Sequence, residues 1–196
     1  MEPSQAQAVR FLRLSRFQRD RVLGHLLRLD AEDRACRFGA ALGDDELRAY
    51  GERIDWTRTL MIGAEVGGEL RAVGELKMVG DGWREPGAEV AITVEGPLQG
   101  RGIGGELLRR LVTLARNRGV RTLCTVCLAR NRRVQRMVRH LGAELTEYGG
   151  ELEGQIDLPR PGYASLAEEV IDAWAGALPR RPPPVAPAAA RPAAPA

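Results

Sequence analysis

The sequence predicts an α/β (α+β) domain in which a mixed, mostly antiparallel central sheet is flanked by helices. Three observations lead to this fold class. Two β-rich stretches are joined by a Gly-Gly turn at residues 59–79, a glycine cluster at residues 99–105 opens an amphipathic helix, and strands alternate with helices after it. The 44% hydrophobic content and the length of 196 residues are enough for one domain with a core and an appendage.

The N-terminal third is predicted to be helical after one short strand at Val9–Leu14. A helix over Asp20–Leu29 carries its leucines and valine on one face. The stretch "DAEDRACRFGAAL" continues as a second helix that we expect to end at Gly43. A third helix, Asp44–Asp55, begins with three acids, which the positive end of a helix dipole favours.

The centre is predicted to be a β-hairpin followed by a third strand. Its two arms are Thr59–Val66 and Glu69–Val79, joined by Gly67-Gly68. A loop through Trp83 and Pro86 then leads to a strand at Ala88–Val94.

The glycine cluster is followed by a predicted helix at Gly104–Arg118, with a buried leucine stripe and Arg109, Arg110, Arg116 and Arg118 in solvent. A strand at Arg121–Ala129 comes next. Asn131 is expected to cap a helix that stops at Gly142, and a hairpin about Gly149-Gly150 closes the sheet. We expect one domain over residues 1–160, a C-terminal helix over 161–178 that packs on the domain or on a second copy, and a disordered Pro/Ala-rich tail over 179–196.

The charge distribution points to a polyanionic ligand. The net charge is only +3, but Leu107–Ala143 holds ten arginines and no acid, directly after the glycine cluster. This segment has no aromatic residues, so we expect no nucleic-acid partner. The absence of an 18-residue apolar run argues against a membrane span, and the N-terminus lacks an apolar signal region, so we expect a cytoplasmic location. Cys124 and Cys127 fit a structural role better than a metal site, and no metal is expected.

The stretch "QGRGIGG" (Gln99–Gly105) matches two phosphate-binding templates. Gly100, Gly102 and Gly105 give G-x-G-x-x-G, but a dinucleotide site needs an acid about 20 residues later, and none is present. A triphosphate loop needs G-K-[ST], which is also absent. The second template, Q-x-x-G-x-G, resembles the pyrophosphate loop of acetyl-CoA-dependent acyltransferases and suits a helix N-terminus beside an arginine-rich segment.

With "AEVAITVEGPLQGRGIGGELL" and "ARNRRVQRMVRHLGAEL", the chain resembles the GNAT superfamily of N-acetyltransferases from about Val9 to Leu158. "HLLRLDAEDRACRFG" is also similar to the bacterial branch that acetylates protein lysines. The resemblance implies acetyl-CoA as co-substrate, with pantetheine pairing to the backbone of Ile92, Thr93 and Val94. It also implies that Asn131 contacts the pantetheine or separates the strands, a plain helix cap being the alternative. The N–H groups that would hold the pyrophosphate belong to Gln99, Gly100, Arg101, Gly102, Ile103, Gly104 and Gly105.

The resemblance implies Glu89 as the general base that takes the proton of the acceptor amine; the alternative is a surface glutamate at a strand end. Glu95 is a second candidate. Many relatives have a tyrosine acid where this chain has Val138, so no general acid is assigned. The expected reaction is direct acetyl transfer to a primary amine, a protein lysine or a small molecule, in a ternary complex. A non-catalytic acyl-CoA sensor is the alternative, and a homodimer is left open.

Overall fold

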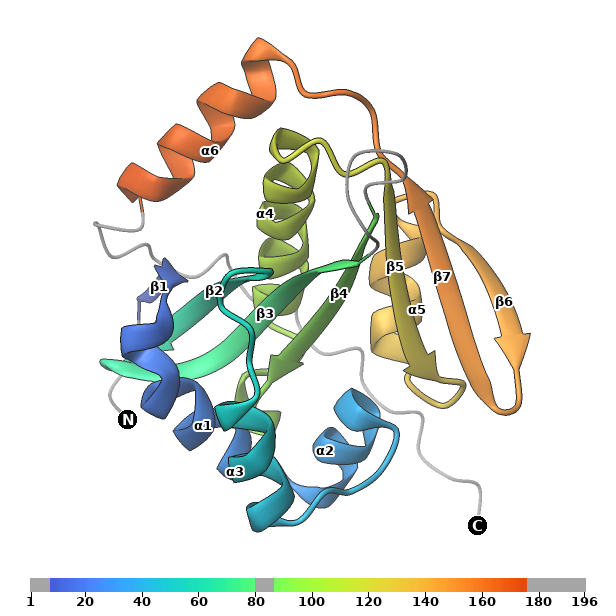
Figure 1. The fold of residues 1–196 in the computed structure, drawn as a ribbon. Helices are drawn as coiled ribbons and strands as arrows, with labels where there is room; N and C mark the ends of the chain where they lie inside the picture. Colours follow the sequence, from blue (N-terminus) through green and yellow to red (C-terminus); the bar gives the residue numbers. More distant parts are fainter. Residues whose placement is uncertain (1–7, 80–86, 176–196) are drawn as a thin grey trace, which may run out of the picture.

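The computed structural model describes residues 8–79 and 87–175. Its centre is a seven-stranded sheet in the order β1-β2-β3-β4-β5-β7-β6, in which only β4 and β5 run parallel. This confirms the predicted mixed, mostly antiparallel sheet (Figure 1). The strands are β1 (Val9–Leu14), β2 (Thr59–Val66), β3 (Glu69–Val79), β4 (Gly87–Val94), β5 (Thr122–Leu128), β6 (Glu144–Tyr148) and β7 (Glu151–Asp157).

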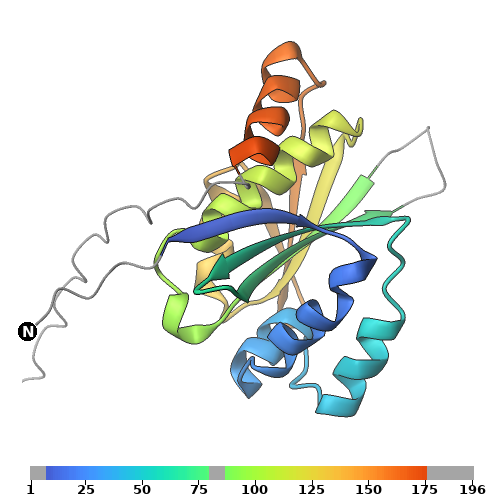
Figure 2. The same ribbon diagram turned by 90° about the vertical axis from the view of Figure 1, so that its left-hand side faces the viewer.

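Helices cover both faces of the sheet. Figure 2 shows α1, α2 and α3 on one side, and α4 with α6 on the other. The α-helices are α1 (Arg19–Leu27), α2 (Ala31–Phe38), α3 (Asp44–Glu52), α4 (Ile103–Asn117), α5 (Arg132–Arg139) and α6 (Tyr163–Ala175), and short 3-10 helices lie at η1 (Arg16–Gln18) and η2 (Gly96–Leu98).

Each face of the sheet has its own apolar core. Alternating strand residues point to opposite faces. Ala88 and Val90 of β4 therefore pack under the leucine stripe of α4, together with Val138 of α5. Val73 of β3 packs instead with α1 and α3. The N-terminal helices and the α4–α5 layer are thus fixed independently on either side of β4.

Strands β4 and β5 separate partway along their length. They pair only at Gly87–Glu89 with Thr122–Cys124, although both strands are described to their ends at Val94 and Leu128. Below Glu89 they diverge, which Figure 1 shows as a gap that widens toward α2. The β5-facing backbone groups of Val90–Val94 are consequently left without a neighbouring strand. We call the region between these strands the wedge, with Glu89 at its apex.

The sequence places α2 correctly but not its end. The helix stops at Phe38, because Gly39 adopts a left-handed conformation with φ of 79° that favours glycine. Gly43, the predicted stop, instead precedes α3, and its N–H donates to the Glu46 carboxylate at 2.7 Å. The predicted loop through Trp83 and Pro86 lies outside the described residues, as do the end of the predicted C-terminal helix and the tail.

Helix α6 contacts α4 through polar side chains, which corrects the prediction for Arg110. Only 5% of Arg110 is exposed, and its guanidinium lies over the Phe11 ring and pairs with Asp172 at 3.1 Å. Arg109 also pairs with Asp172, at 2.7 Å, and Arg118 with Glu169 at 2.7 Å. The apolar residues of α6 face outward and are exposed: Leu166, Val170, Ile171 and Trp174.

Among the described helices, none is both long and apolar enough to cross a membrane.

Candidate functional site

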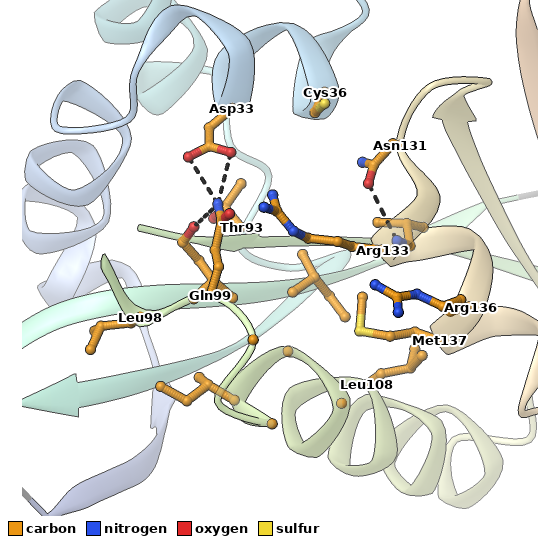
Figure 3. A pocket seen from close by; sticks show the side chains of 18 of the residues that line it. Asp33, Cys36, Thr93, Leu98, Gln99, Leu108, Asn131, Arg133, Arg136 and Met137 are labelled. Atoms are coloured by element: carbon orange, nitrogen blue, oxygen red, sulfur yellow. Dashed lines mark hydrogen bonds between the residues drawn. The ribbon is translucent and has the colours of Figure 1, made fainter. Parts of the chain in front are cut away.

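A cavity of about 550 Å³ lies at the open end of the wedge, between β4, the N-terminus of α4, α5 and α2 (Figure 3). Most of the site residues predicted from the sequence line it. These are Ile92, Thr93, Val94, Gln99, Gly100, Gly102, Ile103, Gly104, Gly105 and Asn131. Arg101 is exposed in the loop and does not line the cavity, and Glu89 lies beyond it at the apex of the wedge.

The glycine loop is shaped by its backbone angles. Gly100 and Gly102 have φ of 75° and 79°, in the left-handed region that favours glycine. Gly102 precedes α4, so the first N–H groups of the helix have no intrahelical acceptor. A Cβ on Gly104 would stand 3.3 Å from the Met137 sulfur, which shows how closely α4 and α5 approach. Free N–H groups and the helix dipole make this end of α4 favourable for an anion.

The side chain of Gln99 fixes the loop in place. Its amide nitrogen donates to the Asp33 carboxylate at 2.8 and 3.0 Å and to the Val94 carbonyl at 2.9 Å (Figure 3). Burial raises the pKa of Asp33 above its ordinary value, against the lowering effect of the Gln99 bond. Sequence reasoning expects only the backbone of Gln99 to act and does not find Asp33, whose position in the cavity depends on how α2 packs.

Helix α5 brings one amide and two guanidinium groups to the cavity. The Oδ1 of Asn131 accepts the Val134 N–H at 3.3 Å, so Asn131 does cap the helix, and its Nδ2 remains as a donor. Arg133 and Arg136 line the same cavity (Figure 3). Within the described residues, neither guanidinium is in an ion pair. The acid-free arginine segment is the signal in the sequence for these two residues, but it does not single them out.

The narrow part of the wedge has a second, small cavity of about 30 Å³. It lies between Val90–Ile92 of β4 and Thr125–Cys127 of β5, and Cys36 and Arg37 of α2 line both cavities. Val138 lines it too and is 1% exposed, so this position has an apolar side chain, whereas the family resemblance would place a tyrosine here in many members. Glu89 is half-buried at the last paired position of β4.

Glu95, the second candidate base, is engaged in a buried ion-pair network. Its carboxylate accepts from Arg28 at 2.9 Å and Arg71 at 2.7 Å, and contacts His25 Nδ1 at 3.1 Å. Burial alone raises the pKa of Glu95, but the bonds from His25, Arg71 and Arg28 outweigh burial and bring it to about 2. A carboxylate held this firmly in its charged form is a poor proton acceptor, so the geometry disfavours Glu95 as the base.

His25 of α1 is fully buried. Its Nε2 lies 2.8 Å from Thr93 Oγ1 on β4, and burial lowers its pKa. The chain Glu95–His25–Thr93 joins α1 to the end of β4 just before the glycine loop. Sequence reasoning misses it because the partners lie about 70 residues apart in the chain.

We expect Glu95→Gln to lower the free energy of unfolding by about 3 kcal/mol at pH 7, since a pKa moved from 4.5 to about 2 corresponds to that energy. The folded-state pKa is the lower one, so this stabilisation is present above pH 4.5 and is lost as the pH falls toward 2. Urea unfolding of both proteins at pH 7 and pH 3 measures it. The difference in free energy of unfolding between the two proteins should be smaller at pH 3 than at pH 7. As a control, Glu144→Gln, at an exposed position, should leave the free energy of unfolding unchanged. An equal difference at both pH values would contradict a stabilising role for the Glu95 network.

In the described part of the chain, no group of three or more His, Cys, Asp or Glu side chains could hold a metal ion.

The fold and this cavity define a class of protein: an α/β domain in which a glycine-rich helix N-terminus, favourable for an anion, lies beside two separated strands. The family model for the acetyltransferase (GNAT) family matches residues 26–143, more than half of the chain. The chain therefore belongs to the GNAT acetyltransferase family.

Solved structures with the same fold cover most of the chain at low identity. The GNAT domain of PAT from S. lividans is 21% identical, with a TM-score of 0.65 over 81% of this chain and 100% of that one. An N-acetyltransferase from Staphylococcus aureus Mu50 is 17% identical, with a TM-score of 0.61 over 77% of this chain and 99% of that one. YncA from Salmonella typhimurium, solved with its cofactor acetyl-CoA, is 18% identical, with a TM-score of 0.58 over 80% of this chain and 96% of that one.

Proposed function

We propose that the protein transfers an acetyl group from acetyl-CoA to a primary amine, by direct attack in a ternary complex. The observation that carries this proposal is the large cavity, which joins the glycine-rich N-terminus of α4 to the unpaired edge of β4. A phosphate-bearing ligand with a long polar arm fits these two features together. The S. typhimurium protein was solved with acetyl-CoA and has the same fold, which supports acetyl-CoA as the ligand.

Each end of acetyl-CoA has a counterpart in the cavity. We assign the pyrophosphate to the N–H groups from Gln99 to Gly105, with Arg101 at the solvent side of the loop. Arg133 and Arg136 would pair with the remaining phosphate charge, because both guanidinium groups line the cavity and neither is in an ion pair within the described residues. The backbone of Ile92, Thr93 and Val94 would pair with the pantetheine arm as an added strand, with Asn131 Nδ2 as a further donor.

The acceptor is proposed to reach the apex from the other face of the sheet. Glu89 shares a face with its register partner Cys124, and the same face continues across β7 and β6. It carries exposed acids that form no ion pair within the described residues: Glu144, Glu151, Glu153 and Asp157. Such a face attracts a cation, which suits an amine that is protonated at neutral pH, in a protein lysine or a small molecule.

Glu89 would act as the general base, directly or through one water molecule. The acceptor ammonium loses a proton to the carboxylate, and the free amine attacks the thioester carbon. The carbon–sulfur bond then breaks, and the attacking nitrogen loses its second proton to water to give a neutral amide. A backbone N–H near Val94 would stabilise the oxyanion. With Val138 in place of a hydroxyl, the leaving thiolate takes its proton from water, which is acceptable because a thiol pKa is moderate.

Val138 also favours a second candidate function, a non-catalytic acyl-CoA sensor. It would use the same cavity and bind acetyl-CoA without turnover. The absence of a tyrosine hydroxyl at this buried position is the observation that keeps this candidate.

Isothermal titration tests the shared part of both proposals, with NADH as the comparison ligand. We expect micromolar binding of acetyl-CoA and no heat from NADH. Release of CoA thiol on addition of a panel of amines then separates enzyme from sensor. A protein that fails to bind acetyl-CoA would refute both.

The proposed organisation is a catalytic domain over residues 1–160, a helix over 161–178 and a tail over 179–196, in a protein of the cytoplasm. The outward apolar residues of α6 make this helix the surface through which we propose that two copies associate.

A further inference from the structure

The only lysine of the chain, Lys77, lies on β3 beside the apex of the wedge. The sequence has 29 basic Lys and Arg residues, and every one except Lys77 is an arginine. Lys77 belongs to β3, is exposed, and forms no ion pair within the described residues. Arginine cannot act as an amine nucleophile because it stays protonated, whereas lysine can. Lys77 therefore provides the only side-chain amine in the sequence.

The register of the sheet places this amine beside the candidate base. Lys77 is the direct antiparallel partner of Glu89, so the two side chains leave the same face of the sheet with Cβ atoms about 5 Å apart. Glu89 is also the last residue of β4 that pairs with β5, and the small cavity begins at the next residue, Val90. The flexible four-carbon stem of Lys77 starts one strand away from the place where the thioester is expected.

The neighbouring described acid on this face, Glu75, is already paired and does not compete with Glu89 for Lys77. Glu75, two residues earlier on the same face, is occupied by Arg37 at 2.9 Å and by the Tyr50 hydroxyl at 2.6 Å. Glu89 is thus the nearest acid in register with Lys77, and within the described residues no cationic side chain forms an ion pair with it.

We propose that Lys77 is a self-acetylation site, modified in cis by the acetyl-CoA bound to its own chain. The inference rests on the proposed acetyltransferase function. Glu89 takes a proton from the Lys77 ammonium, the Nζ lone pair attacks the thioester carbon, and the carbon–sulfur bond breaks. The nitrogen then loses its second proton to the departing thiolate, so the products are a neutral Nε-acetyl-lysine, free CoA thiol and the proton that Glu89 passes on to water. Acetylation removes the one positive charge opposite Glu89 and leaves this part of the face more acidic for a cationic acceptor.

Intact-mass and peptide-mapping mass spectrometry of the full chain, incubated with acetyl-CoA, tests the proposal. We expect one acetyl group on Lys77, at a first-order rate that does not change when the protein is diluted. Lys77→Arg should lose this acetyl group and keep transfer to an external amine. Peptide mapping separates Lys77 from the α-amine of the N-terminus, the other amine of the chain.

Two controls separate enzymatic from chemical acetylation. Urea-unfolded protein reports the rate at which acetyl-CoA modifies an exposed lysine without a site, and we expect the folded protein to exceed it at least tenfold. Glu89→Gln should bring the folded rate down to the unfolded one.

The outcomes distinguish this inference from the function on which it rests. Three results would overturn cis acetylation and leave the proposed function standing, provided that transfer to an external amine is observed. Lys77 could stay unmodified, it could be modified no faster than in urea, or its rate of modification could rise with protein concentration. Failure of external transfer together with failure of acetyl-CoA binding would overturn the proposed function itself.

Discussion

Glu89→Gln is expected to lower kcat for acetyl transfer by about 10²–10⁴-fold while leaving acetyl-CoA affinity unchanged, as the loss of a general base does. Glu89 lies beyond the large cavity, so the amide should not disturb the phosphate or pantetheine contacts. The lost rate should partly return as the pH approaches the amine pKa near ~10.4, because the acceptor then arrives deprotonated. Rate–pH profiles of both proteins and titration with acetyl-CoA measure these effects.

Glu147→Gln is the matched control for this prediction. Glu147 is exposed on β6, and its register partner Leu152 places it on the opposite face from Glu153 and the acidic residues near Glu89. The Glu147→Gln variant should have the same kcat as the unchanged protein at every pH. A Glu89→Gln variant with full kcat would show that Glu89 is a surface glutamate at a strand end, the alternative that the sequence also allows.

Local signals in the sequence predict most of the elements and the glycine loop. The hairpin of β2 and β3 has the expected bounds because Gly67 and Gly68 both adopt positive φ in the turn between two apolar runs. The left-handed Gly100 and Gly102 of the glycine loop are predictable for the same reason. Each depends on the conformation of one residue and its neighbours, which a sequence motif records.

Partners brought together by tertiary packing could not be predicted in this way. Asp33 meets Gln99 across 66 residues, and His25 meets Glu95 across 70. Arg110 was expected in solvent because it stands beside a leucine stripe on α4, and only the docking of α6 buries it. Glu95 is the clearest example, because its three partners come from α1, from the residue that follows α1 and from β3, and nothing in its local sequence indicates a network.

Gly105→Asp is expected to weaken acetyl-CoA binding by about 100-fold or more without destabilising the fold. Gly105 lines the large cavity in the first turn of α4, and a Cβ there would meet no atom within 4 Å, so an aspartate fits. A carboxylate at a helix N-terminus interacts favourably with the helix dipole, so the thermal midpoint should hold or rise. The same carboxylate would occupy the proposed pyrophosphate site, and two like charges about 4 Å apart at an effective dielectric near 20 repel by about 4 kcal/mol. Titration calorimetry and thermal unfolding measure the two effects separately.

Gly105→Asn separates charge from size, because its side chain has nearly the same shape without the charge. We expect it to retain most of the acetyl-CoA affinity, so that the difference between the two variants reports the electrostatic part alone. That difference should also fall as salt is added, since partly exposed charges are screened over about 10 Å at 0.1 M ionic strength. Equal losses in the two variants would mean that the first turn of α4 excludes bulk of any kind. If both variants keep the affinity for acetyl-CoA, the phosphates lie away from this helix end. The assignment of "QGRGIGG" as the pyrophosphate loop would then be wrong.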